Sequence, residues 1–264
     1  MKLNRSNITC TVNNMSIFIE KPNLPIKKVK TVLIDYRVDK DILSTLEEMK
    51  IDAIKTVCCE ELYEAIKGHP DILIHHVTGE NIVIAPNVYE KLALRFIKKG
   101  FALTKGATWL HRNYPSNIAY NVLRIGNLAF HNTKYTDPEI LKLYEKYNIK
   151  LIHINQGYAK CSVCVVNENS AITHDRGVAK VLENNGIEVL VIEPGDILLE
   201  QLSYGFIGGS TGLISKDTIA FSGEIGHMKD YEKILEFLHL KGINIKILSK
   251  KKIMDIGSII PISY

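Results

Sequence analysis

The 264-residue sequence lacks three features that would assign it to common functional classes. No apolar run approaches the ~20 residues that a membrane-spanning helix needs, so no membrane partner is expected. No block of Lys and Arg is long enough for a nucleic-acid patch, and the net charge is only +4. Lys2 and Arg5 precede no apolar stretch of the secretory type. These absences predict a cytoplasmic protein that binds neither nucleic acid nor membrane.

Cysteine is scarce, and its distribution is uneven. There are five cysteines, an odd number, and none follows Cys164. Their spacings fit no disulfide framework, which favours free thiols in a reducing compartment. Cys161 and Cys164 form a CxxC pair, but a single pair is a weak zinc signal, and positions three apart on a strand face opposite ways. We therefore predict no metal and no cofactor.

A repeat is the main positive feature of the sequence. A short apolar strand, a helix, a second strand and a third strand with a Gly/Asn turn recur about five times. The strands that open the repeats are centred 43 to 51 residues apart, on Leu33, Ile84, Ala129, Ile172 and Ala220. Periods of ~20–50 residues are typical of propellers and other arrays. An open doubly wound sheet is the alternative, but tight Gly/Asn turns between strands are typical of hairpins.

The predicted fold is therefore α/β, with five ββαβ-type repeats closed into a pseudo-symmetric β/α-propeller. Residues 31–264 form the predicted domain, and residues 1–30 a predicted extension that includes an edge strand at Ser16–Glu20. Each repeat should send one strand to the axis: Asp71–His75, Asn117–Asn121, Cys161–Val165, Phe206–Ser210 and Asp255–Ile259. Glycines and polar residues on these strands predict a small polar pocket at the axis.

Three stretches carry a resemblance to a known family. They are Asn121–Gly126, Gly157–Cys164 and Asp255–Ile260. With the five repeats, they resemble the pentein superfamily of guanidino-group-modifying enzymes, which includes arginine deiminase, dimethylarginine dimethylaminohydrolase and amidinotransferases. The local stretches also resemble an uncharacterised, clostridial-type bacterial branch with this fold. The resemblance implies an active site at the axis, with a cysteine nucleophile, a histidine and an acidic clamp for the cation.

The sequence departs from that pattern at three places. Ser258 and its neighbours stand where the enzymes carry their C-terminal cysteine, Ala159 stands at the histidine position, and Asn121 at the acidic clamp. The resemblance therefore implies no ordinary guanidine hydrolysis of arginine, agmatine or methylated arginines. A cysteine on the third repeat could still supply the nucleophile from another side of the axis, since the repeats are pseudo-symmetric.

The predicted catalytic residues are Cys161, with a pKa lowered by Lys160, and His75. The predicted ligand-binding residues are His76, Asn121, Cys164, Gly208, Gly209, Ser210, Asp255 and Ser258. Structural interpretations stay open beside these: buried core cysteines, a hydrogen-bonded histidine pair, and close backbone packing at the two glycines. We expect an axial cavity with Cys161 or Cys164 on its wall and His75 or His76 within reach.

Three functions remain open from the sequence. The first is binding of a small polar or amino-acid-like ligand at the axis, without ordinary guanidine hydrolase chemistry. The second is a guanidino-group-modifying hydrolase or amidinotransferase-like enzyme with Cys161 as a relocated nucleophile. The third is a non-catalytic binding or scaffold protein, similar to the pentein that prevents association of ribosomal subunits. The sequence does not determine the oligomeric state.

Overall fold

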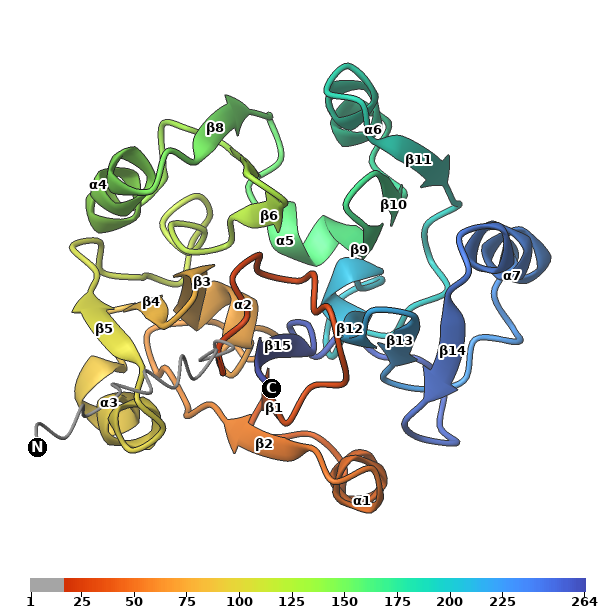
Figure 1. Cartoon of the computed structure of the whole chain (residues 1–264), viewed down its shortest axis with the longest axis horizontal. Coiled ribbons are helices and arrows are strands. Elements are labelled where there is room, and N and C mark those ends of the chain that lie inside the picture. Colours follow the sequence, from red (N-terminus) through yellow and green to blue (C-terminus); the bar gives the residue numbers. More distant parts are fainter. Residues whose placement is uncertain (1–16) are drawn as a thin grey trace, which may run out of the picture.

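The computed structural model describes residues 17–264 and shows five small sheets arranged in a ring (Figure 1). Each sheet has three strands. In ring order, the first sheet consists of β15 (Ile260–Ser263), β1 (Thr31–Ile34) and β2 (Asp52–Lys55), and the second of β3 (Ile74–Thr78), β4 (Asn81–Ile84) and β5 (Ala102–Lys105). The third consists of β6 (Leu123–Ile125), β7 (Leu128–His131) and β8 (Lys150–His153), and the fourth of β9 (Val163–Asn167), β10 (Ser170–Thr173) and β11 (Glu188–Val191). The fifth consists of β12 (Thr211–Ser215), β13 (Thr218–Phe221) and β14 (Asn244–Ile247).

All five sheets follow one pattern. The middle strand is antiparallel to the inner strand and parallel to the outer strand. A parallel pair needs a crossover, and here a helix supplies it each time. These helices lie on the outside of the ring: α1 (Lys40–Glu48), α3 (Tyr89–Ile97), α4 (Pro138–Lys146), α6 (Arg176–Glu183) and α7 (Tyr231–Leu240) (Figure 1). The predicted five-bladed β/α-propeller is confirmed.

The first and last strands of the chain close the ring. β15 pairs antiparallel with β1, with Leu33 opposite Ile260, while β2 pairs parallel on the other side of β1. One sheet therefore contains both ends of the repeat array, as expected if residues 31–35 close against the last strand.

The inner strands begin later than the sequence predicted. Pro70–Leu73 forms the helical turn α2, Ala159–Ser162 forms α5, and Gly208–Ser210 forms the 3₁₀ turn η1. The corresponding segments before β6 and β15 are also non-strand, up to residues 122 and 259. A buried helical turn and a buried strand are both short and apolar, so hydrophobic periodicity does not separate them. The first residues of the expected axial strands therefore lie on tight turns, and His75 and Cys164 lie on the strands β3 and β9 that follow.

The segment before β1 packs along the closing sheet. Phe18 forms a β-bridge with Ser263, and the Ile19 amide donates to the Ile262 carbonyl at 3.3 Å. Further along, the Asn23 amide group donates to the Arg124 carbonyl across the ring at 3.0 Å. The predicted edge strand at Ser16–Glu20 is thus reduced to a single bridge, and Ser16 lies outside the described residues. No helix within residues 17–264 has the length and hydrophobicity to cross a membrane.

Candidate functional site

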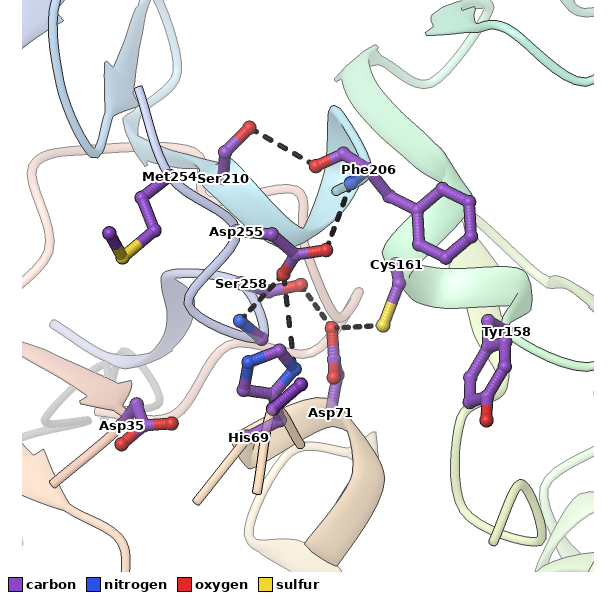
Figure 2. Close-up of polar contacts among 12 residues, drawn as sticks. Asp35, His69, Asp71, Tyr158, Cys161, Phe206, Ser210, Met254, Asp255 and Ser258 are labelled. Atoms are coloured by element: carbon purple, nitrogen blue, oxygen red, sulfur yellow. Dashed lines mark hydrogen bonds and ion pairs between the residues drawn. The ribbon is translucent and has the colours of Figure 1, made fainter. Parts of the chain in front are cut away.

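Three segments meet at the axis and form an acidic cluster with a thiol (Figure 2). Asp71 comes from α2, Cys161 from α5, and Asp255 and Ser258 from the loop before β15. All four residues are buried, with exposed fractions of 0 to 3%. Residues separated by up to 187 positions in sequence are hydrogen-bonded here, so the ring closure itself assembles the site.

Asp71 is the centre of the cluster. Its Oδ2 accepts a hydrogen bond from the Cys161 thiol at 3.1 Å and one from the Ser258 hydroxyl at 2.6 Å. The Lys160 ammonium donates to the same Ser258 oxygen at 2.9 Å, which links a buried cation to the carboxylate through the hydroxyl. The second carboxylate oxygen, Asp71 Oδ1, is buried without a hydrogen-bond partner in the described structure. Buried acceptors normally have partners, so this oxygen marks a place where a ligand donor would be stabilised.

Asn121 fixes the position of the thiol. Its Oδ1 accepts from the backbone amides of Lys160 and Cys161 at 2.8 and 3.3 Å, and its Nδ2 donates to Cys161 Sγ at 3.0 Å. The same Nδ2 also donates to the Asp71 carbonyl at 3.1 Å. One buried amide therefore joins α2 to α5 and holds the sulfur against Asp71.

His69 and Asp255 form the second half of the site. His69 is the residue before α2, and its Nδ1 lies 3.9 Å from Asp255 Oδ1, too far for a hydrogen bond. Asp255 accepts backbone hydrogen bonds from Gly257 at 3.0 Å and Phe206 at 2.9 Å. His69 Nδ1 is buried and has no hydrogen-bond partner among residues 17–264. Two unpartnered polar atoms, one on an imidazole and one on a carboxylate, thus occur in one buried cluster.

The electrostatics of the cluster keep the thiol protonated. Burial raises the pKa of Cys161 well above its ordinary range, and the neighbouring charges of Asp71 and Asp255 raise it further. Burial also raises the pKa of Asp255, against the opposing effect of His69. The predicted lowering of the Cys161 pKa by Lys160 is wrong, because the ammonium is directed to Ser258 and the Gly208 carbonyl. A cation at this site would reverse these effects, because it favours both carboxylate and thiolate.

A cavity of about 200 Å³ lies against this cluster. His69, Cys161 and Asp255 contribute to its wall. The remaining lining is mainly aromatic and aliphatic: Tyr63, Ile66, Tyr158, Leu199, Leu202, Ser203, Tyr204 and Phe206. A concave, mostly apolar pocket with a few convergent polar groups is the usual form of a small-molecule site.

His69, Asp71 and Cys161 could also hold a metal ion. One ligand atom from each lies within 4.8 Å of the others, and all three residues are buried. Nitrogen, oxygen and sulfur donors together suit Zn²⁺, although the atoms would have to move closer to reach tetrahedral spacing. The cluster is therefore suited to bind either a metal ion or an organic cation. The absence of a metal stays a prediction.

The expectation for the axial cavity was half right. Cys161 is on the wall of the cavity, whereas His75 and His76 do not line it. His75 Nε2 is hydrogen-bonded to the Tyr144 hydroxyl at 2.6 Å, and His76 Nε2 to the Gly79 carbonyl at 2.8 Å. His75 and His76 line a separate small cavity, and Asn23, Asp71, Arg124 and Lys160 also contribute to its wall. The histidine that shares the cavity with Cys161 is His69.

The other predicted ligand-binding residues divide into two groups. Asn121, Asp255 and Ser258 belong to the cluster, as described above. Cys164 packs with apolar residues of a different core cluster, and burial raises the pKa of its thiol to about 11. Ser210 donates within its own turn, to the carbonyls of Phe206 and Ile207.

Gly208 and Gly209 allow close packing rather than anion binding. A Cβ on Gly208 would lie 2.3 Å from the Val163 carbonyl oxygen, and a Cβ on Gly209 would lie 2.0 Å from Asp255 Oδ1. The Gly209 carbonyl accepts from the amides of Ile256 and Ser258, which fixes the loop that carries Asp255. The two glycines therefore shape the site without contacting its cavity.

Sequence reasoning missed His69 and Asp71 because it read Asp71–His75 as a strand. The signal that could have found them is His69-Pro70-Asp71. Proline is favoured in the first turn of a helix, and an acidic residue is stabilised there. Recognition of that turn would have placed His69 and Asp71 on it, and His75 beyond it on the inner strand.

A family model matches residues 33–260, which is most of the chain. It describes a family of unknown function, DUF6873. The chain belongs to this family. No curated protein matches the sequence. Membership of DUF6873 therefore names no activity, and the fold and the site carry the functional argument.

Solved structures with a similar fold include two amidinotransferases and a DDAH. An amidinotransferase of the saxitoxin biosynthetic pathway from Microseira wollei is 12% identical, with a TM-score of 0.53 over 87% of this chain and 91% of that chain. The inosamine-phosphate amidinotransferase from Streptomyces griseus is 10% identical, with a TM-score of 0.52 over 88% and 91%. DDAH from Pseudomonas aeruginosa, solved with citrulline, is 8% identical, with a TM-score of 0.52 over 84% and 92%. These likenesses show that the DUF6873 protein has the pentein fold, while the clostridial-type branch stays a prediction.

Proposed function

We propose that this protein is an enzyme that modifies a cationic amidino or guanidino group, with Cys161 as its nucleophile. The observation that carries the proposal is the buried Cys161 thiol beside Asp71, on the wall of a ligand-sized cavity that also contains His69 and Asp255. The fold supports the same chemistry, because its solved relatives include amidinotransferases and DDAH. The absence of cysteine beyond Cys164 does not argue against it, since Cys161 brings a thiol to the axis from the third repeat.

The cation has a clear place in the site. Asp255 lies on the same cavity wall as Cys161, and Asp71, which does not line this cavity, is hydrogen-bonded to the thiol and has an unpartnered Oδ1. A planar amidinium donates two parallel N–H groups to a carboxylate, and such charge-assisted pairs are the strong ones. We therefore assign cation binding to Asp71 and Asp255. They would replace the acidic clamp of the pentein enzymes, whose position is occupied here by Asn121.

The reaction follows from this placement. Loss of the thiol proton to the Asp71 carboxylate produces the thiolate, and the bound cation favours this transfer by lowering the pKa of Cys161. The sulfur attacks the central carbon, an S–C bond forms, and one C–N bond then breaks. His69 is close enough to the cluster to protonate the departing amine. Attack by water on the S-linked intermediate restores the thiol and releases a urea or amide; attack by a second amine transfers the amidino group.

A pair of isosteric electrophiles tests the proposal. Chloroacetamidine is a cation at neutral pH, whereas chloroacetamide is neutral and has nearly the same shape. We expect chloroacetamidine to alkylate Cys161 at least tenfold faster, as read by peptide mass spectrometry, with free cysteine as the control for intrinsic reactivity. Equal rates after that correction, or labelling of Cys58 alone, would refute the proposal. EDTA in the buffer keeps metal ions out of the site.

The elevated pKa of Cys161 favours a second candidate, a protein that binds a cation without transforming it. A thiol that stays protonated is a poor nucleophile. Ammonia and amine release from a panel of guanidines and amidines separates the two functions. Binding of a cation with no release above the level of a Cys161→Ala control would favour this binding function.

A further inference from the structure

We infer that the natural ligand of the Cys161 cavity is a cation with an apolar body and no carboxylate. This inference rests on the proposed function and adds the class of ligand. It also replaces the amino-acid-like ligand expected from the sequence. The proposed function concerns the group that reacts with Cys161, whereas this inference concerns the rest of the ligand and is drawn from the side chains that line the cavity.

The charged and titratable groups of the cavity lining can accept or balance a cation, but none is a Lys or Arg. Asp255, His69 and Cys161 lie at the cluster, and the other titratable lining residues are Tyr63, Tyr158 and Tyr204. A ligand carboxylate in this cavity would meet Asp255 and no Lys or Arg, and His69, its one imidazole, lies beside the Asp255 carboxylate. Burying an unpaired anion beside a carboxylate is strongly unfavourable.

Basic side chains close to this region have other partners or face another cavity. The Arg37 guanidinium is paired with Asp35 and donates to the carbonyls of Glu64 and Ala65, and Arg37 lines a different cavity. Lys160 donates to Ser258 and to the Gly208 carbonyl, and it is absent from this wall. Neither residue is free to bind a ligand carboxylate without breaking buried hydrogen bonds.

The outer wall offers flat apolar surfaces. The Tyr158 and Phe206 rings lie 6.2 Å apart with an interplanar angle of 36°, and Tyr114 lies 5.9 Å from Tyr158. The His174 ring, which does not line the cavity, is stacked on Phe206 at 5.2 Å and 6°. Such rings bind apolar bodies by offset or edge contacts and attract cations to their faces. Because a water occupies ~30 Å³ of liquid, about 200 Å³ accommodates a group comparable to roughly seven waters. A ligand made of one small ring or a short alkyl chain with a planar cationic group is small enough for this volume.

Two matched ligand pairs test the inference by calorimetric titration in buffer with EDTA. Agmatine and arginine differ by a carboxylate, and so do phenylguanidine and 4-guanidinobenzoate. To separate binding from turnover, the protein is the full chain with Cys161→Ser. We expect the carboxylate-free member to bind at least tenfold more tightly in each pair. Equal or tighter binding of the carboxylate-bearing members would overturn the inference.

A substitution at the cavity mouth provides the converse test. Ser203 is exposed and lines the cavity, so Ser203→Arg would add the missing basic group without disturbing the core. This variant should bind 4-guanidinobenzoate at least tenfold more tightly than the parent, whereas the neutral Ser203→Gln should not. An unchanged affinity in a folded Ser203→Arg variant would contradict the inference.

The inference and the proposed function fail in different ways. If wild-type Cys161 prefers chloroacetamidine but neither pair shows the carboxylate effect, only the inference is wrong. If the carboxylate effect is found but the two electrophiles react equally, the proposed chemistry is wrong and the ligand class is supported.

Discussion

Two cavities near the axis of this ring differ in the charged side chains that line them. The Cys161 cavity is about 200 Å³, has Asp255 on its wall and contains no Lys or Arg. The second cavity is about 20 Å³ and is lined by Arg124, Lys160, His75 and His76, with Asp71 and with Asn23 of the preceding segment on its wall. We call these the acidic cavity and the basic cavity.

The basic cavity already contains a guanidinium, that of Arg124. This group is buried and forms no ion pair within residues 17–264, although Asp71 lines the same cavity; it donates to the backbone carbonyls of Val77, Gly126 and Leu128. His75 and His76 beside it are buried, and their pKa values are lowered first by burial and further by the Arg124 charge. His76 Nδ1 and Asp71 Oδ1 on this wall have no hydrogen-bond partner within residues 17–264, but little space remains beside them, which is the pattern of a structural site.

The difference lies in the open volume beside the unpartnered polar atoms. In the acidic cavity, His69 Nδ1 is unpartnered and about 200 Å³ of space is available beside it. In the basic cavity, Asp71 Oδ1 and His76 Nδ1 are also unpartnered, but the volume is only about 20 Å³. Burial of polar residues near the axis is therefore a poor guide to function, and free hydrogen-bonding capacity beside an open volume is a better one.

The largest expected effect is at the thiol. Cys161→Ala should reduce labelling by chloroacetamidine and any release of amine by at least ~100-fold, because no other thiol lines the acidic cavity. Cys164→Ala, which alters a buried thiol with a pKa raised to about 11, is the matched control and should retain both activities. Loss of labelling in both variants would show that the effect is structural.

A change at the basic cavity should cost stability and leave chemistry intact. Arg124→Met removes the donor for three carbonyls, two of them in buried hydrogen bonds, and each buried acceptor left unpaired costs about 1–3 kcal/mol. We expect the free energy of unfolding, from urea denaturation, to fall by about 3 kcal/mol or more. The rate ratio between the two electrophiles should stay unchanged in the folded variant. A collapse of that ratio would mean that the two cavities are functionally coupled.

Asp71→Asn should have two opposite effects on Cys161. The Asp71 charge raises the pKa of the thiol, so its removal should speed alkylation by neutral chloroacetamide near pH 8. The same change weakens cation binding, and a loss of 1.4 kcal/mol corresponds to about tenfold. The ratio of chloroacetamidine to chloroacetamide rates should therefore fall by about tenfold. Parallel changes in both rates would argue against a cation-binding role for Asp71.

Lowering the pH should destabilise the folded protein through His76 in the basic cavity. Burial lowers the pKa of His76 from 6.5 to about 4, so the unfolded chain binds its proton first as the pH falls. The contribution of the neutral His76 ring to the free energy of unfolding is complete above pH 6.5 and is lost as the pH approaches 4. At pH 5 the free energy of unfolding is lower by about 2 kcal/mol through this residue. His76→Gln should flatten the decline of unfolding free energy between pH 6.5 and 5, and an unchanged slope would show that His76 does not contribute to it.

The repeat and the ring closure were predictable from the sequence because they depend on spacing and on hairpin turns. Cys161, Asn121, Asp255 and Ser258 were also placed at the axis correctly. His69 and Asp71 were missed because a buried helical turn has the same apolar pattern as a strand. An error of a few residues in the start of the strand therefore assigned His75, instead of His69, to the Cys161 cavity. The aromatic wall could not be predicted, since Tyr63 and Tyr204 lie in irregular segments whose position depends on the packed ring.

The hydrogen bond from Ser258 to Asp71 also has a consequence for the order of events during protein synthesis. The two residues are 187 positions apart, and β15 follows directly after Ser258. A growing chain exposes Cys161 long before Asp255 and Ser258 have been made. The thiol therefore acquires its second carboxylate and its enclosed environment only after the last repeat has joined the first. A ribosome-bound chain ending before residue 255 should react with both electrophiles alike, so discrimination between them would report completion of the ring.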